Sequence, residues 1–129
     1  MTPDDLDDAA IGFMEERHLA TLTTLRSDGT PHVVAIAFTW DPGAQIARII
    51  TRVGSQKVAN VRRRGRAAVA QVDGARWVSL EGPARVTERP DEVAEAVRRY
   101  ARRYRPPSEA HDRVAIEIQV ERVLGRWHV

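Results

Sequence analysis

Near its N-terminus the sequence reads Leu19-Ala20-Thr21-Leu22-Thr23-Thr24-Leu25-Arg26-Ser27-Asp28-Gly29, and this stretch predicts a β-hairpin. The first seven residues are strand-like. Ser27-Asp28-Gly29 forms a turn signal in which the glycine can adopt positive φ. We therefore expect the chain to return along residues 32–40 as a second, antiparallel strand.

The rest of the chain extends this pattern outward from the hairpin. Asp41-Pro42-Gly43 turns the chain into a third strand, and an Asp73-Gly74 turn joins two later ones. Short helices are expected at about residues 3–14, 56–63 and 90–104. Six mostly antiparallel strands fit a small closed barrel better than a parallel sheet, which needs a helical crossover after every strand. Besides the hairpin, the expected strands are residues 46–52, 67–72, 77–87 and 114–123.

The run Val33-Val34-Ala35-Ile36-Ala37-Phe38 is apolar on both faces of its strand. In so small a protein, one face then meets a ligand or a second subunit. We interpret this strand as lining a pocket at a dimer interface. The alternative is a strand buried wholly within its own subunit.

Composition limits the class of protein. A chain of 129 residues is expected to form one domain, residues 1–129. There is no cysteine, and the four histidines show no metal-ligand spacing, so we expect no metal site. No apolar run reaches the roughly 20 residues of a membrane span, and the first residues are acidic. We expect a cytoplasmic protein with no membrane partner.

The basic residues are distributed unusually. Of the 20 basic side chains, 19 are arginines and one, Lys57, is lysine. Lys57 follows Ser55, a natural helix N-cap, so it falls among the first free amides of a helix, where phosphate binds well. Lys57, Asn60 and Arg64 lie at i, i+3 and i+7 on one face, which favours a phosphate site. Two alternatives without a binding role stay open. The single lysine can be a result of chance, and the arginine clusters can be solvated helix faces.

These residues resemble those of the flavin- and deazaflavin-binding split β-barrels related to pyridoxamine 5′-phosphate oxidase. The resemblance covers nearly the whole chain. Ser55-Gln56-Lys57 resembles that family's Ser-Arg-Lys phosphate grip, with Gln in place of Arg. Within the family, the chain is similar to the short branch that uses the deazaflavin coenzyme F420. The other motifs that carry the resemblance are Leu19-Ala20-Thr21-Leu22, Asp28-Gly29-Thr30-Pro31, Arg66-Ala67-Ala68-Val69 and Trp77-Val78-Ser79-Leu80-Glu81-Gly82-Pro83-Ala84.

The resemblance implies a six-stranded antiparallel split β-barrel, mainly β with short helices, that forms a homodimer. The dimer interface would hold two equivalent cofactor sites, each built from both subunits, for coenzyme F420 or alternatively FMN. Trp77 and Val78 would reach the cofactor from the partner subunit, and Arg62, Arg63 and Arg64 would meet the oligoglutamate tail of F420. The phosphate would be held by Ser55, Gln56, Lys57 and Asn60, and the ring would lie along Val34, Ala35, Ile36, Ala37, Ile50 and Thr51.

The implied activity is hydride transfer from reduced F420 to a conjugated small molecule, a tetrapyrrole such as biliverdin, which becomes bilirubin. Gln56 suits a phosphodiester better than a terminal phosphate. The C-terminal Arg-and-His pattern of vitamin B6 oxidases is missing, so that reaction is not expected. No catalytic residue is assigned, although His32 and Arg48 are possible proton donors.

Two other classes of protein stay open. The first is an FMN-binding oxidoreductase, or a non-catalytic carrier of flavin or F420, on the same fold. The second is a nucleic-acid binder, for which the pI of about 9.6 is the only argument. Because interleaved aromatic residues and a helix-turn-helix signal are both missing, we expect no nucleic-acid partner.

Overall fold

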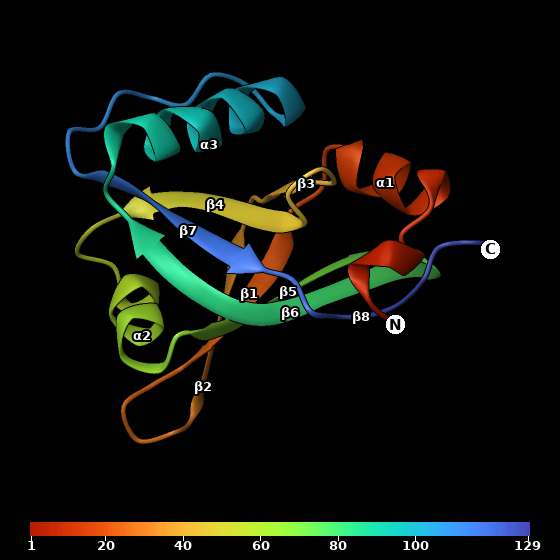
Figure 1. Ribbon diagram of the computed structural model, residues 1–129, viewed down its shortest axis with the longest axis horizontal. Helices are drawn as coiled ribbons and strands as arrows, with labels where there is room; N and C mark the ends of the chain where they lie inside the picture. Colours follow the sequence, from red (N-terminus) through yellow and green to blue (C-terminus); the bar gives the residue numbers. More distant parts are fainter.

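The computed structural model describes residues 1–129 as eight β-strands, three α-helices and one short 3-10 helix. Figure 1 shows the strands around the centre of the molecule, with the helices at its margins. The elements in chain order are η1 (Pro3–Asp5), α1 (Asp8–Glu15), β1 (Ala20–Leu25), β2 (Pro31–Ile36), β3 (Thr39–Asp41), β4 (Ile46–Arg52), α2 (Gln56–Arg64), β5 (Arg66–Asp73), β6 (Arg76–Thr87), α3 (Pro90–Arg103), β7 (Arg113–Gln119) and β8 (Arg122–Arg126).

Every pair of neighbouring strands is antiparallel, as the sequence predicts. The strand order is β2-β1-β5-β6-β7-β4-β3, and β8 also pairs with β6. Strand β6 has 12 residues and serves both halves of the sheet. Its residues 77–81 pair with β8, and its residues 84–87 pair with β7. The sheet therefore curls about β6, which runs through its middle (Figure 1).

The structure divides the predicted strand 32–40 into β2 and β3, because the chain changes partners within it. Strand β2 pairs with β1, whereas β3 pairs with β4. At the break, the carbonyl of Phe38 accepts a 2.6 Å hydrogen bond from Arg103 instead of pairing in a strand. The uninterrupted apolar run gave no sign of this break.

The last predicted strand, residues 114–123, also divides in two. Strand β7 pairs with β4 and β6, and the chain then crosses to the other half of β6 as β8. Gly82 permits the crossing, since a Cβ atom there would lie 2.0 Å from the carbonyl oxygen of Gln119. Two predicted strands therefore become four, and six become eight.

The core is one cluster of 23 buried side chains, to which the helices contribute unequally. Asp7 caps α1 by accepting a 3.0 Å hydrogen bond from the amide of Ala10, and α2 inserts Val58 and Val61. The apolar residues of α3 recur at helical spacing, which is typical of a core-facing stripe, but they are only half-buried, and the buried residues of α3 are Ala96 and Arg103. No helix combines the length and the hydrophobicity of a membrane span.

Candidate functional site

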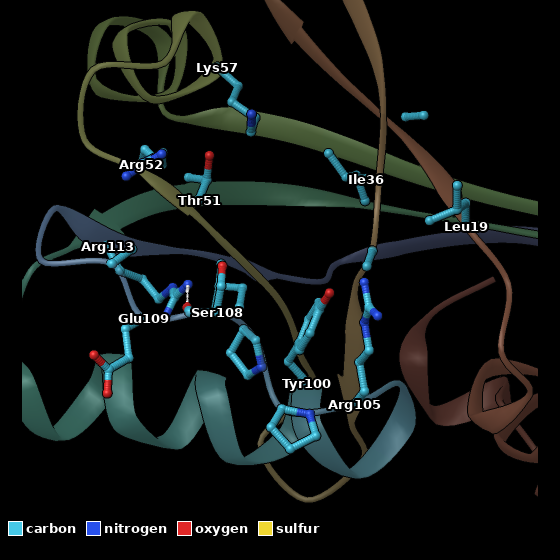
Figure 2. Close-up of a pocket in the computed structure, with 16 residues that line it drawn as sticks. Leu19, Ile36, Thr51, Arg52, Lys57, Tyr100, Arg105, Ser108, Glu109 and Arg113 are labelled. Carbon is cyan, nitrogen blue, oxygen red and sulfur yellow. Dashed lines mark hydrogen bonds between the residues drawn. The ribbon is translucent and has the colours of Figure 1, made fainter.

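A cleft with a volume of about 780 Å³ lies between the ends of β2 and β4, the start of α2 and the end of α3. The segment 105–110 closes one wall (Figure 2). The lining mixes apolar side chains with basic ones. Half of the twelve predicted cofactor residues line this cleft, namely Ala35, Ile36, Ala37, Ile50, Thr51 and Lys57.

Lys57 is the charged group with the clearest role in the cleft. It lies in the first turn of α2, after the N-cap Ser55, and Figure 2 shows its amino group pointing into the cleft. No carboxylate lies within ion-pair distance, although most arginines of the chain have such a partner. Burial lowers the pKa of Lys57, so an anion that neutralised it would find a partly dehydrated partner. The first turn of α2 contains no acidic residue that would compete for the free amides.

Two open strand edges face the cleft. Strand β2 pairs only with β1, so its other edge has no strand partner. Strand β4 pairs with β3 only at residues 46–48, so Ile50 and Thr51 lack a partner on that side. Backbone amides and carbonyls at such edges are available to a ligand. This gap between β2 and β4 is suited to a planar molecule that hydrogen-bonds along its rim.

Unlike Lys57, the other predicted phosphate residues already have side-chain partners within the chain. The hydroxyl of Ser55 lies 3.4 Å from that of Thr51, and Gln56 donates a 2.7 Å hydrogen bond to Asn60. Asn60 has no exposed surface and donates to the hydroxyl of Thr24. An anion at Lys57 would therefore meet Ser55 and Gln56 more readily than Asn60.

Three further predicted contacts lie outside the cleft of the single chain. Val34 packs against the core, and Val78 is fully buried within it. Trp77 lies on the opposite side of the sheet from Val78, at the β5–β6 hairpin, and is 38% exposed. The two possible proton donors are not in the cleft either. Arg48 is instead held by Asp41 at 2.8 Å and Glu117 at 3.7 Å.

Several residues of the cleft have no distinguishing pattern in the sequence. Tyr100 turns its hydroxyl into the cleft, where it has no hydrogen-bond partner in the chain (Figure 2). Arg52, Arg105 and Arg113 add positive charge, and Pro106-Pro107 fixes the wall between the last two. The one sequence feature that marks this wall is the Pro106-Pro107 pair, which ends the preceding helix.

The arginines at the end of α2 lie at the other end of the helix from Lys57. Arg62 forms a 2.7 Å ion pair with Glu88, and Arg64 donates to the carbonyl of Ser27. Neither lines the cleft. The arginines that line the cleft are instead Arg52 of β4 and Arg105 and Arg113 after α3.

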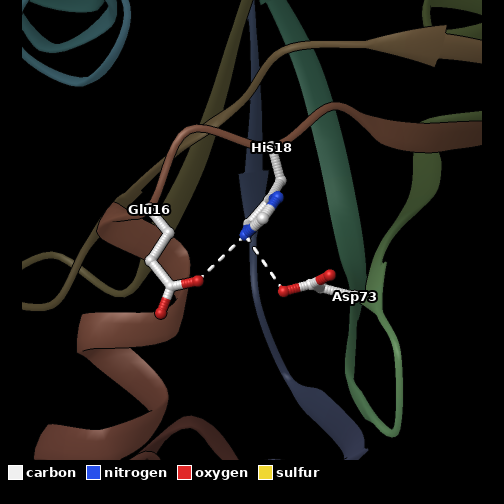
Figure 3. A group of neighbouring side chains, drawn as sticks. All are labelled: Glu16, His18 and Asp73. Carbon is white, nitrogen blue, oxygen red and sulfur yellow. Dashed lines mark hydrogen bonds and ion pairs between the residues drawn. The ribbon is translucent and has the colours of Figure 1, made fainter.

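A second polar cluster, also missed from sequence, joins Glu16, His18 and Asp73 (Figure 3). His18 Nε2 lies 2.9 Å from Glu16 and 3.6 Å from Asp73. The spacing would suit a metal, but Arg76 already forms 2.8 Å ion pairs with both carboxylates. Arg76 and His18 hold the pKa of Glu16 at about 2. The cluster is an ion-pair network that ties the end of α1 to the β5–β6 hairpin.

The curled antiparallel sheet, with its cleft at the gap between β2 and β4, has the architecture of a split β-barrel, as predicted. Residues 6–127 match the family model described as pyridoxamine 5′-phosphate oxidase. The chain therefore belongs to the pyridoxamine 5′-phosphate oxidase family.

Individual relatives refine this assignment. The chain is 58% identical over 120 residues to the F420H(2)-dependent biliverdin reductase of Mycobacterium tuberculosis, covering 93% of this chain and 88% of that protein. A conserved hypothetical protein of Mycobacterium tuberculosis has a similar crystal structure, with TM-score 0.80, 27% identity and coverage of 95% and 85%. An F420 reductase structure matches with TM-score 0.72, 26% identity and coverage of 88% and 94%.

Proposed function

We propose that this chain is a reductase that uses reduced coenzyme F420 to convert biliverdin to bilirubin. The observation that carries the proposal is the unpaired, half-buried amine of Lys57 at the edge of a cleft of about 780 Å³ with two open strand edges. The high identity to a biliverdin reductase that depends on F420H(2) supports this cofactor and substrate.

The residues of the cleft fit the cofactor. The phosphate would bind Lys57, the amides that begin α2 and the side chains of Ser55 and Gln56. The ring would lie along residues 35–37 and beside Ile50 and Thr51, and would complete the open backbone edges. Asn60 would support this arrangement from the core, through Thr24 and Gln56, without touching the phosphate.

The bound cofactor supplies the hydride, and the chain positions the acceptor carbon and limits the access of water. Each reduced substrate molecule also gains a proton. Tyr100 carries a hydroxyl that points into the cleft and has no other partner. The centroid of the Tyr100 ring lies 5.2 Å from that of the Tyr104 ring, and this contact restricts the orientation of the Tyr100 side chain. We assign Tyr100 as the donor of this proton, which water then restores.

An open face of the sheet supports a homodimer. This face is formed by β1, β2, β5, β6 and β8. Its residues lie opposite one another in the strand pairs, and many of them are small, such as Thr21, Ala70 and Ser79. A second copy would cover its exposed apolar side chains. Trp77 belongs to this face, so in a two-fold dimer it would approach the partner's cleft, whereas Val78 would contribute only its backbone. The large apolar side chains that this face exposes are Val33 at 56%, Val72 at 64%, Trp77 at 38% and Leu124 at 49%.

The test is an anaerobic reaction of the purified protein with reduced F420 and biliverdin, followed by the absorbance of both compounds. We expect F420 to be oxidised in proportion to bilirubin formed. Parallel reactions with reduced FMN test the alternative cofactor. Turnover with FMN but not with F420 would contradict the proposal.

A further inference from the structure

We propose that Arg105 determines substrate specificity by receiving a carboxylate of the substrate, so that the cleft selects flat apolar molecules with a carboxylate arm. The inference rests on the proposed function and deepens it, because it concerns how the same cleft chooses its substrate. It follows from the charges of the cleft, from the backbone that holds Arg105 and from the apolar side chains beside it.

The charges of the cleft leave two cations without a partner. Arg52 donates to both carboxylate oxygens of Asp112, at 3.0 and 3.2 Å. Arg113 donates to the carbonyl of Ser108 at 2.6 Å. Lys57 and Arg105 form no hydrogen bond or ion pair in the chain. Since Lys57 is assigned to the phosphate of the cofactor, Arg105 is the cation left for a second anion.

Arg105 lies on the wall opposite Lys57. In Figure 2 it rises from the end of α3 beside Tyr100, whereas Lys57 descends from α2. Glu109, the acidic residue of the cleft lining, lies near Arg113 at the other end of this wall. An anion at Arg105 is therefore not placed beside that carboxylate, and phosphate and carboxylate would occupy separate places.

The backbone at Arg105 is restricted. Helix α3 ends at Arg103, and Arg105 precedes Pro106, a position that disfavours helical geometry. Pro106 and Pro107 then fix the direction of the chain. The guanidinium is thus presented from a stiff segment, and its planar fork matches a carboxylate in a bidentate pair.

The surroundings of Arg105 define the rest of the ligand. Leu19 is 65% exposed at the same end of the cleft, the ring of Tyr100 is half-buried there, and the largely buried Ile36 completes the apolar lining. A ligand that covers these side chains and carries a carboxylate on a short arm would match both the apolar lining and the guanidinium of Arg105. Biliverdin has this chemistry in its pyrrole rings and two propionates, and its dimethyl ester has the same rings without the charges.

The experiment compares binding of biliverdin and biliverdin dimethyl ester through quenching of tryptophan fluorescence. The variants are Arg105→Gln, Arg105→Lys and the control Arg102→Gln, which removes an exposed, unpaired arginine outside the cleft. We expect Arg105→Gln to weaken biliverdin binding about fivefold to tenfold, as for one partly exposed ion pair, and to leave ester binding unchanged. Arg105→Lys should retain part of the preference for the free acid, and Arg102→Gln all of it.

Titration with oxidised F420 completes the test. Arg105→Gln should bind F420 as the wild type does. Weaker F420 binding with unchanged biliverdin binding would mean that Arg105 meets the acidic tail of the cofactor, and would overturn the inference. Equal losses for the acid and the ester, or no loss for either, would also overturn it. A wild-type protein that does not reduce biliverdin would instead overturn the proposed function, and this inference with it.

Discussion

The side-chain amide of Asn60 donates a 3.0 Å hydrogen bond to the hydroxyl of Thr24, and both residues are fully buried. This bond fixes the rotation of α2 against β1. Because the helix cannot turn about its axis, Val58 and Val61 stay in the core and Lys57 stays directed at the cleft. A buried hydrogen bond thus sets the direction of a half-buried charge.

Replacing Lys57 with alanine should weaken F420 binding about 10- to 100-fold, because a charge-assisted hydrogen bond to the phosphate is lost. Stability should hardly change, since Lys57 has no partner in the chain. Fluorescence titration and urea unfolding measure the two effects. Arg89→Ala removes an exposed charge elsewhere and should affect neither. Unchanged affinity in Lys57→Ala would mean that the phosphate binds elsewhere.

Replacing Tyr100 with phenylalanine should lower turnover tenfold or more while leaving F420 and biliverdin affinities unchanged, because only the transferred proton is removed. Steady-state rates and binding titrations separate the two. Tyr104→Phe is the matched control, since its hydroxyl donates to the carbonyls of His18 and Phe38 and is already engaged. That variant should lose about 1 kcal/mol of stability and little turnover. Equal turnover in Tyr100→Phe and the wild type would remove Tyr100 from the reaction.

Two glycine-to-alanine changes should shift stability in opposite directions. In Gly82→Ala the new Cβ atom would lie 2.0 Å from the Gln119 carbonyl, so β6 and the crossing chain must separate. We expect a loss of more than about 3 kcal/mol, as for severe overpacking. Gly12 lies within α1 with open space around it, so Gly12→Ala should gain up to about 1 kcal/mol from helix propensity. Urea unfolding of both variants checks the signs, and a stable Gly82→Ala protein would contradict the crossing geometry.

Arg103 should matter for stability far more than its neighbour Arg102. Its guanidinium donates to the carbonyls of Glu16 and Phe38 and to the side chain of Gln71, and burial lowers its pKa. Arg103→Met would leave these acceptors without their donor, so we expect a loss of about 3 kcal/mol. Arg102→Met, on the exposed side, should stay within about 0.5 kcal/mol. Thermal and urea unfolding measure the difference, and similar stabilities would contradict the network.

The Glu16 network should make stability depend on pH. Its pKa of about 2 in the folded protein, from Arg76 and His18, lies below the ordinary value of 4.5. The stabilisation is therefore present above about pH 4.5 and is lost as the pH falls toward 2. Glu16→Gln should flatten the pH dependence of the unfolding free energy in this window. Glu15→Gln, which removes a carboxylate without an ion pair, should leave the wild-type slope unchanged, and parallel slopes for all three proteins would contradict the prediction.

Local patterns predicted most of the fold. The turn at Ser27-Asp28-Gly29, the helix start after Ser55 and the prolines at 106 and 107 each depend on a few neighbouring residues, so the sequence reveals them. The breaks inside residues 32–40 and 114–123 depend on which distant strand the chain meets next. An apolar run has the same residue pattern whether it pairs with one strand along its length or with two strands in succession.

The cleft was only partly predictable for the same reason. Lys57 stood out because its residue type is rare in this chain. Arg103 and Arg105 could not be distinguished from the other arginines near the end of α3, although one is buried and the other lines the cleft. Tyr100 belongs to the apolar stripe of α3, and such a pattern is typical of core residues. Its position at the cleft depends on how α3 crosses β4, which no local pattern records.

The gap between β2 and β4 also bears on how this protein behaves without a ligand. Uncapped strand edges are templates on which another polypeptide can add. A ring bound along residues 35–37 and beside Thr51 would occupy those edges. The coenzyme would then protect these strand edges as well as supply hydride. In cells short of the coenzyme, the protein would be in its ligand-free form, which is more prone to aggregate.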